Sequence, residues 1–281
     1  MKRAIVILLV VVGVVAVGIR VLGASKANNV PGAVTHRGQE VIGFEARTPR
    51  SLRCIHFLTA PPVLDGDLSD WPAWDSIDVN RATAFSFSGL VGSTLDLSAT
   101  VRSGWVADTL YFAIQVSDDV IVTDSADVWR DDGVEIGLDG LRDGQAWGGD
   151  DHQYTLVADG RVTDRGVVVT DVLAAAGRFP GGYTIEVGIP ISKLIPGAPI
   201  SGTVMAFTVG VHDDDDGGNW DAYLIWEGTS TSSSPALFGS LVFSERPEDR
   251  IAVLEAKVTQ LEAKVQELLT VLSQFEKLTP P

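Results

Sequence analysis

Hydrophobic residues alternate with polar or small ones through most of the middle of the chain, from Ile55 to about Glu245. A period of two is typical of strands with one buried face. The segments are short, are separated by turns, and have no amphipathic helix between them. We therefore predict an antiparallel, jelly-roll-like β-sandwich over residues 55–245. The strand candidates are 94–106, 109–118, 133–139, 152–159, 161–171, 183–190, 203–213, 222–228 and 236–244.

The stretch "DSADVWRDDGVEIGLDG" (124–140) contains the clearest alternation. Val134, Ile136 and Leu138 fall on one face of the predicted strand, and Glu135 falls on the other. The pattern predicts that Glu135 points away from the core. Two interpretations stay open for it, a solvent-exposed acid and a ligand-binding one.

The C-terminal segment has a different period. In residues 249–279 the apolar positions recur 3 and 4 apart, at Ile251, Leu254, Val258, Leu261, Val265, Leu268, Leu272 and Phe275. This pattern predicts a helical coiled coil of four heptads, about 28 residues or roughly 42 Å long. β-Branched residues at the a positions with leucine at d suit a dimer. The segment "RIAVLE" (250–255), repeated as "KVTQLE" (257–262), resembles a pattern of parallel trimers, which we favour over the dimer.

The N-terminus has the pattern of a targeting segment. Lys2 and Arg3 precede sixteen apolar residues, and Ser25 and Ala27 provide the small residues of a cleavage site. We predict that residues 1–27 are a signal peptide or, alternatively, a membrane anchor. Residues 28–54 have no sustained periodicity and are predicted to form a linker. Both alternatives place the protein outside the cell, secreted or anchored facing outward.

Charge is distributed unevenly over the 281 residues. The formal charge of −16 divides into +6 for residues 1–54, −21 for 55–245 and −1 for 246–281. A domain at −21 repels phosphate backbones, so no nucleic-acid partner is expected. The acidic runs at 117–119 and 212–221 suit a hard cation such as calcium as well as they suit a solvated surface. Cys54 is the only cysteine, so the domain depends on its core and not on a disulfide, and we expect the thiol to be buried or reduced.

Five blocks of the middle segment resemble the family 9 carbohydrate-binding modules and their DOMON-like relatives. They are "APPVLDGDLSDWPAW" (60–74), "ATVRSGWVADTLYFAIQVSDD" (99–119), "VWRDDGVEIGLDG" (128–140), "YTIEVGIPISKL" (183–194) and "LIWEG…PALFGSLVF" (224–243). They occur in the order of that family and span nearly the whole predicted domain. The resemblance implies a β-sandwich that binds carbohydrate, and it implies structural calcium.

The resemblance also implies site residues. Two tryptophans would enclose a terminal sugar whose hydroxyls bond to a glutamate, and Trp129 and Glu135 match the first tryptophan and the glutamate. The second wall stays open between Trp226 and Trp220, which follows Asn219, and Trp147 is a third aromatic candidate. Calcium is expected at Asp118 and Asp119.

Other functional classes fit the chain less well. Asp131 and Glu135 share a face but lie about 13 Å apart along a strand, beyond the spacing of a glycosidase acid pair. Met205 and His212 share one strand, which does not suit the two sides of a haem, so no organic cofactor is expected. We predict a non-catalytic carbohydrate-binding protein, oligomerised so that it presents several weak sites. The alternatives are a structural stalk or adhesion protein that binds no sugar, and an accessory subunit of a glycoside hydrolase.

Overall fold

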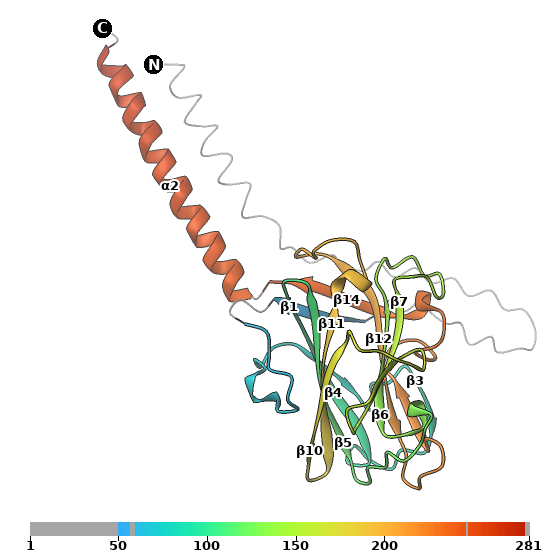
Figure 1. The fold of residues 1–281 in the computed structure, drawn as a ribbon. Coiled ribbons are helices and arrows are strands. Elements are labelled where there is room, and N and C mark those ends of the chain that lie inside the picture. Colours follow the sequence, from blue (N-terminus) through green and yellow to red (C-terminus); the bar gives the residue numbers. More distant parts are fainter. Residues whose placement is uncertain (1–49, 57–59, 246, 279–281) are drawn as a thin grey trace, which may run out of the picture. The chain divides into compact units, whose positions relative to one another are not determined.

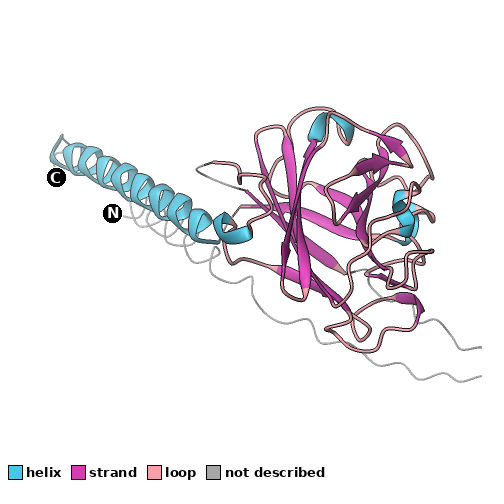
Figure 2. Ribbon diagram, turned by 60° about the horizontal axis from the view of Figure 1, so that its bottom comes forward, coloured by secondary structure: helices cyan, strands magenta, loops and turns pink. Residues whose placement is uncertain are grey.

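The computed structural model describes residues 50–56, 60–245 and 247–278 of the chain. The predicted signal peptide or anchor and nearly all of the predicted linker lie outside these residues. The described residues comprise a β-sandwich followed in sequence by one helix, and Figure 2 distinguishes the strands of the sandwich from this helix.

One layer of the sandwich contains five strands, labelled in part in Figure 1. Four of them run antiparallel in the order β10, β11, β5, β4, and the short strand β2 continues the free edge of β4. Their bounds are β10 Leu173–Phe179, β11 Gly182–Pro190, β5 Thr109–Asp118, β4 Leu97–Val106 and β2 Ser76–Val79.

The other layer follows the order β12, β6, β7, β8, β9, also antiparallel, and β13 and β3 extend it beside the second half of β12. The bounds are β12 Val204–Asp213, β6 Gly133–Asp139, β7 Asp151–Val157, β8 Val162–Asp164, β9 Val167–Val168, β13 Ala222–Ile225 and β3 Ser86–Gly89. Four short 3-10 turns lie between strands: η1 Leu68–Asp70, η2 Val128–Arg130, η3 Ile191–Lys193 and η4 Pro235–Leu237.

Strand β1 (Ser51–His56) joins the two layers into one curled sheet. It pairs in parallel with β14 (Gly239–Ser244) on one side and with β4 on the other, and β14 in turn pairs with β12. The predicted linker therefore extends too far, because residues 51–54 belong to this central strand. Cys54 lies within it and is completely buried, as expected for a thiol with a packing role, and this burial raises its pKa.

The apolar faces of the two layers pack against each other and form one core. Phe112 of β5 stacks on Phe207 of β12 with ring centroids 5.3 Å apart. Val134, Ile136 and Leu138 are all fully buried here, so the face predicted for them is confirmed. The predicted sandwich is confirmed as well, and Thr109–Asp118 and Gly133–Asp139 have the bounds that the alternation predicts.

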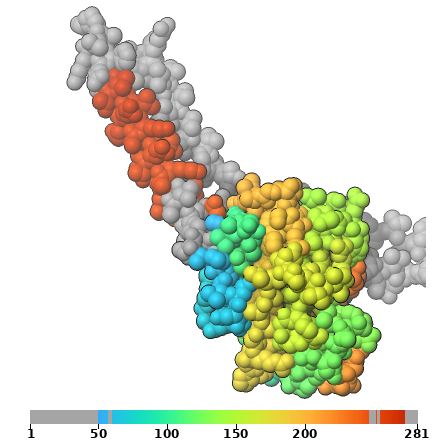
Figure 3. Space-filling view, in the orientation of Figure 1, coloured from blue at the N-terminus to red at the C-terminus, as the bar shows by residue number. Residues whose placement is uncertain are grey.

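The segment at 60–74 covers the outer face of the first layer, where Figure 3 shows its blue surface beside the yellow one. Buried Glu186 of β11 accepts hydrogen bonds from Trp71 Nε1 at 2.7 Å and from the N–H groups of Asp65 and Gly66 at 3.0 and 2.7 Å. Gly66 has a φ of +86°, and a Cβ there would lie 2.7 Å from the backbone of Ala176. The Asp-Gly and the tryptophan of this motif therefore fasten the segment to the sheet.

Helix α2 (Pro247–Leu278) confirms the helical period predicted for the C-terminal segment. Six of the predicted seam positions are exposed in the single chain, from 40% at Val265 to 64% at Leu268; the others among the six are Ile251, Leu254, Val258 and Leu261. The coiled coil itself stays a prediction. Within the described part of the chain, no helix has both the length and the apolar character needed to cross a membrane.

Candidate functional site

A cavity of about 560 Å³ opens on the outer face of the second layer. Strands β6, β7, β12 and β13 form its floor, and the segments around η2, before β13 and after β13 form its walls. The floor residues are Glu135, Gln153, Thr155, His212 and Tyr223; the wall residues are Val128, Trp129, Trp220, Thr229, Ser230 and Ser232, with Ser88, Arg165 and Gly166 at the rim.

Glu135 is the acceptor on which the polar side chains of the floor converge. Its Oε1 accepts hydrogen bonds from Gln153 Nε2 at 3.1 Å and from Thr155 Oγ1 at 3.3 Å. Its Oε2 accepts one from Tyr223 Oη at 3.0 Å and another from Thr231 Oγ1. Only 5% of Glu135 is exposed, so the acid that alternation places off the core is nevertheless buried. Loops cover this face of the sheet, and the alternation of residues in a strand does not predict where such loops lie.

A glycine in the neighbouring strand makes room for this network. Gly210 of β12 lies opposite Glu135 in the register, and a Cβ at this position would come within 2.4 Å of Tyr223 Oη. The missing side chain allows the tyrosine ring to lie across β12 and reach the carboxylate. A larger residue at Gly210 would displace Tyr223 from Glu135.

Glu135 remains ionised over the whole neutral and mildly acidic range. Burial alone would raise its pKa, but the charge of His212 and hydrogen bonds from His212, Thr231 and Tyr223 outweigh burial and lower the pKa to about 2. A group of this kind cannot act as a general acid near neutral pH because it carries no proton. The carboxylate is therefore a permanent acceptor and a permanent negative charge in the cavity.

His212 lies between the carboxylate and the two aromatic walls. Its Nδ1 is 2.6 Å from the carbonyl oxygen of Trp129, and because a carbonyl only accepts, this nitrogen carries a proton. Its Nε2 is 3.4 Å from Glu135 Oε2, so the second nitrogen also faces an acceptor. The imidazole ring lies 6.4 Å from the Trp220 ring and 4.4 Å from the Tyr223 ring. His212 thus holds the turn that carries Trp129 above the floor.

The structure places Trp129 and Trp220 in the wall of the cavity and Trp226 elsewhere. Trp129 is 39% exposed on η2, whereas Trp226 is 1% exposed and packs on Phe207 in the core at 5.5 Å. A ring buried to this extent cannot stack on a ligand, so of the two candidates left open for the second wall only Trp220 lies in the lining of the cavity. Asn219 is exposed beside Trp220 and is not part of the lining.

Several residues of the floor and rim do not appear among the predicted site residues. Gln153 and Thr155 alternate with buried apolar residues of β7 and so share the face of Glu135, which the sequence pattern could have shown. Arg165 lines the rim, and its guanidinium lies 5.8 Å from the ring of Trp147. Trp147 itself is not in the lining and contacts the site only through this arginine.

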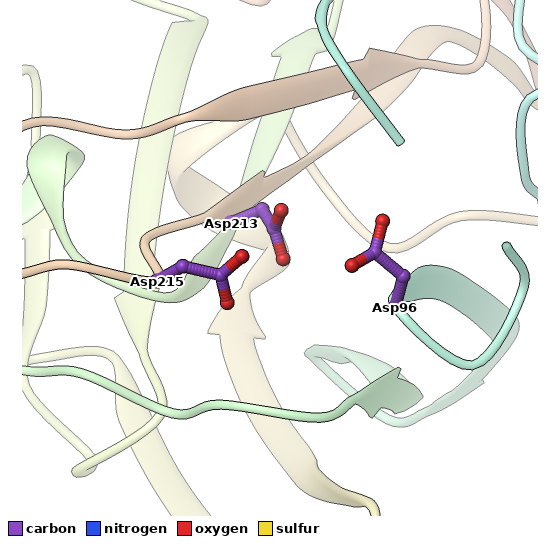
Figure 4. Close-up of side chains that lie close together, drawn as sticks. All are labelled: Asp96, Asp213 and Asp215. Carbon is purple, nitrogen blue, oxygen red and sulfur yellow. The ribbon is translucent and has the colours of Figure 1, made fainter. Parts of the chain in front are cut away.

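Aspartates gather near the end of β12, beside the turn that carries Trp129. Asp118 lies within 4.8 Å of Asp132 and Asp213 by carboxylate oxygens, and all three are buried. Asp213 also belongs to a second group with Asp96 and Asp215, whose carboxylates point toward one another in Figure 4. Asp119, which was expected beside Asp118, is exposed and lies outside the first group. The carboxylates that join Asp118 are Asp132, which directly precedes β6, and Asp213, which ends β12.

Among the ion pairs of the described residues, none involves Asp118, Asp132 or Asp213. Asp118 Oδ2 and Asp213 Oδ1 are buried and have no hydrogen-bond partner. Burial, with the charges of Asp215, Asp96 and Asp132, raises the pKa of Asp213 to about 8. Burial also raises the pKa values of Asp118 and Asp132, and the charge of Asp213 adds to the increase at Asp118 as that of Asp118 does at Asp132. Protons or a divalent cation are therefore needed to offset the negative charge here.

A family model matches most of the chain. The model described as carbohydrate family 9 binding domain-like covers residues 64–246, nearly the whole sandwich. The chain is 25% identical over 240 residues to endo-1,4-beta-xylanase A of Thermoanaerobacterium saccharolyticum, covering 74% of this chain and 19% of the xylanase. It is 25% identical over 247 residues to exoglucanase XynX of Acetivibrio thermocellus, covering 75% of this chain and 21% of the exoglucanase. The chain thus spans about a fifth of the length of these enzymes.

Two solved structures share the fold. Both are of a carbohydrate binding module family 9 from Caldicellulosiruptor kristjanssonii, one in complex with cellotriose and one with glucose. Each is 22% identical to this chain, with TM-scores of 0.61 and 0.60. The similarity covers 71% and 70% of this chain and 96% and 97% of the module. At this identity the comparison shows a common fold.

Proposed function

Since the chain belongs to the carbohydrate family 9 binding domain-like family, we propose that its cavity binds the terminal sugar of a β-linked glucan or xylan and performs no catalysis on it. One observation carries this proposal. A permanently ionised carboxylate, Glu135, lies at the floor of a cavity with tryptophans in its wall. Pyranose rings have apolar C–H faces that stack on indole rings and hydroxyl groups that donate to carboxylates.

The hydrogen-bond network around Glu135 explains how a sugar hydroxyl would bind there. Four protein donors already fill the acceptor positions of the carboxylate, two of them the hydroxyl groups of Tyr223 and Thr231. A hydroxyl can rotate, so a sugar hydroxyl can take the place of either one at Glu135 while the displaced group bonds to the ligand. Arg165 offers further donors at the rim. Binding in the millimolar to micromolar range, about −4 to −8 kcal/mol, is expected for so small a contact.

Calorimetric titration of the protein with glucose, xylose, cellobiose, xylobiose, cellotriose, xylotriose and a non-β-linked control such as maltotriose tests the proposal. We expect saturable binding of the β-linked oligosaccharides at one site per chain, with most of the free energy already present in the disaccharide. Heat changes indistinguishable from dilution for every sugar, from protein that is folded and oligomeric, would favour the structural alternative, in which the sandwich serves as a spacer or adhesion unit.

We further propose that α2 forms a parallel coiled-coil trimer that presents several such sites. The support is the row of exposed apolar residues at heptad spacing along a helix of 32 residues. Linked sites gain about 10² to 10⁴-fold in avidity for a polymer without any new contact. Export of the chain, secreted or membrane-anchored, and work beside a glycoside hydrolase are consistent with this arrangement and belong to the same proposal.

Replacing Leu261 and Val265 by lysine is expected to convert the oligomer to a monomer. Both side chains belong to the exposed apolar row, at 61% and 40% exposure, and a charged residue at these positions opposes helix association. Light scattering coupled to gel filtration should report a threefold fall in mass, with affinity for a soluble trisaccharide unchanged. Replacing Thr259 and Gln266 by lysine is the matched control, since both residues are exposed and lie off the apolar row and outside the trimer pattern, and it should leave the mass unchanged.

Calcium is proposed as the structural cofactor of the group formed by Asp118, Asp132 and Asp213. Three buried carboxylates within 4.8 Å, two of them with an oxygen that lacks a hydrogen-bond partner, are the ligands this ion prefers. Bound there, the ion would tie the end of β5 to the starts of β6 and of the loop after β12. The turn that carries Trp129 lies between these segments, so calcium would stabilise one wall of the cavity.

A further inference from the structure

A second cavity, of about 520 Å³, lies on the outer face of the first layer, whereas the cavity at Glu135 lies on the outer face of the second. Strands β4, β5, β11 and β10 form its floor, and the turn η1 with the residues before it forms one wall. This volume is within the range of about 300–1,000 Å³ that is typical of small-molecule sites. The polar and aromatic lining comprises Asp67, Ser69, Arg102, Gln115, Phe179 and Thr184.

The register of the sheet brings the floor side chains of this second cavity together. Gln115 of β5 lies directly opposite Thr184 of β11. Arg102 of β4 lies opposite Ala113, two residues before Gln115, so Arg102 and Gln115 point to the same face of the sheet. An arginine, an amide and a hydroxyl from three adjacent strands therefore share one floor.

An aromatic ring lies at one end of this floor, over a glycine. Phe179 of β10 is opposite Gly182 of β11, and a Cβ at Gly182 would come within 2.8 Å of Phe179 Cζ. The ring therefore occupies the space that a side chain at position 182 would fill. Phe179 is partly exposed, so one side of the ring is accessible to the apolar C–H groups of a sugar.

Arg102 is the charged residue of the floor, and it is not paired with a carboxylate within the described part of the chain. Its Nε atom is buried without a hydrogen-bond partner. The carboxylates of the neighbouring strands are bound elsewhere, since Asp78 accepts from Thr100 Oγ1 at 3.1 Å and Glu186 accepts from Trp71 Nε1 at 2.7 Å. A buried donor without an acceptor is costly, and an anionic ligand would remove that cost.

The negative charge of the sandwich does not prevent an anion from binding here. At physiological salt, charges more than about 8 Å apart are largely screened, so the −21 of residues 55–245 acts weakly on a ligand beside Arg102. Asp67 is the one carboxylate of the lining, and its Oδ1 accepts from the N–H of Ser69 at 2.9 Å. A carboxylate has further lone pairs, with which Asp67 can accept from a sugar hydroxyl.

We propose that this second cavity binds a uronic acid residue of an acidic polysaccharide. The guanidinium of Arg102 binds the sugar carboxylate through charge-assisted hydrogen bonds, and Phe179 contacts the C–H face of the ring. Gln115 and Thr184 bond to its hydroxyl groups. A neutral sugar would leave Arg102 Nε without an acceptor and bind more weakly. The site does not rest on the function proposed for the cavity at Glu135, with which it shares no residue.

Calorimetric titration of the full chain carrying Trp129→Ala with trigalacturonate tests the site. This background removes the contribution of the cavity at Glu135, so the result does not depend on whether that cavity binds sugar. The fully methyl-esterified trisaccharide is the matched ligand, because it keeps the rings and lacks the charge. We expect saturable binding of the acid with a dissociation constant of about 0.1–1 mM, and at least tenfold weaker binding of the ester. Xylotriose carrying a glucuronate, titrated alongside, distinguishes a uronate side group from a uronate in the main chain.

Arg102→Gln in the same background should weaken binding of the acid tenfold or more, to the level of the ester. Arg81→Gln is the matched control, since it removes the same charge at an exposed residue outside the cavity, and it should leave both affinities unchanged. If Arg102→Gln does not fold, Gln115→Glu at an exposed position should weaken the acid equally through charge repulsion. Equal affinity for acid and ester, undiminished binding in the folded variants, or no binding of either uronate up to 10 mM would overturn the site.

Discussion

Trp129→Ala is expected to weaken binding of a β-linked trisaccharide, measured by calorimetric titration, by about thirtyfold or more. Trp129 is the exposed ring on the wall of the cavity, and truncating a tryptophan at the centre of a contact typically costs about 2 kcal/mol or more. A dissociation constant of about 1 mM would rise to about 30 mM, too weak to detect by calorimetry, and one of about 1 μM would rise to about 30 μM. Trp220→Ala, on the wall beside His212, should have an effect of the same order.

The control for both variants is Trp226→Phe. This ring is buried against Phe207, so the variant should lower the melting temperature and leave the affinity within about twofold. Circular dichroism and thermal melts of Trp129→Ala should match those of the wild type because the residue is largely at the surface. Undiminished sugar binding in a folded Trp129→Ala protein would remove this cavity as the binding site.

Metal-free protein is expected to lose stability as the pH rises from about 4 to 8, the reverse of ordinary acid denaturation. The folded-state pKa values of Asp118, Asp132 and Asp213 are raised, to about 8 for Asp213, whereas an unfolded aspartate titrates near 3.9. Between these values the folded state holds protons that the unfolded state has released, so the free energy of unfolding falls with rising pH. The loss should reach a few kcal/mol, a large share of the ~5–15 kcal/mol that stabilises a domain.

Calcium competes with these protons for the carboxylates, so its effect on stability should depend on pH. Thermal melts at pH 5 and pH 8 should show a small stabilisation by millimolar calcium at pH 5 and a large one at pH 8. Glu135 does not disturb this comparison. Because its folded-state pKa is about 2, its contribution to the free energy of unfolding is nearly constant above pH 4.5 and is lost only in stronger acid. In Asp213→Asn, the fall of the melting temperature with pH and its increase on adding calcium should both be smaller than in the wild type. A metal-free melting temperature that rises from pH 4 to 8 would contradict the assignment.

Strand period predicts which face a residue lies on, but not what covers that face. The alternation in β6 places Glu135 off the core correctly, yet its burial depends on Thr231 and Tyr223, which are remote in sequence. In β13 the same period already decides between the two candidate walls, since Trp226 shares the core face with Leu224 while Tyr223 faces the cavity. The resemblance to the family left both tryptophans open, and the strand period was not used to choose between them.

The acidic groups could not be predicted from the sequence alone, because which aspartates lie together depends on the topology of the sheets. Asp118, Asp132 and Asp213 come from three strand ends that meet only when β5 is in one layer and β6 and β12 are in the other. No spacing along the chain indicates that meeting, and the neighbouring Asp119 was the natural but incorrect companion for Asp118. Strands β2, β3 and β10 were missed for a related reason: they are short or rich in small residues and lie at edges, where the burial that creates a hydrophobic period is weak.

The position of β1 has a consequence for the order in which the chain folds. Ser51 pairs with Ser240 and Cys54 with Phe243, so the strand that joins the two layers finds its partner only when almost the whole domain exists. Contacts so distant in sequence form slowly, because the entropy cost of closing a long loop arises before the stabilising contacts form. We expect the growing chain to stay unclosed until β14 is available. For the export proposed above, a nascent chain that cannot finish folding early would remain competent for threading through a translocation channel, and closure would follow on the far side.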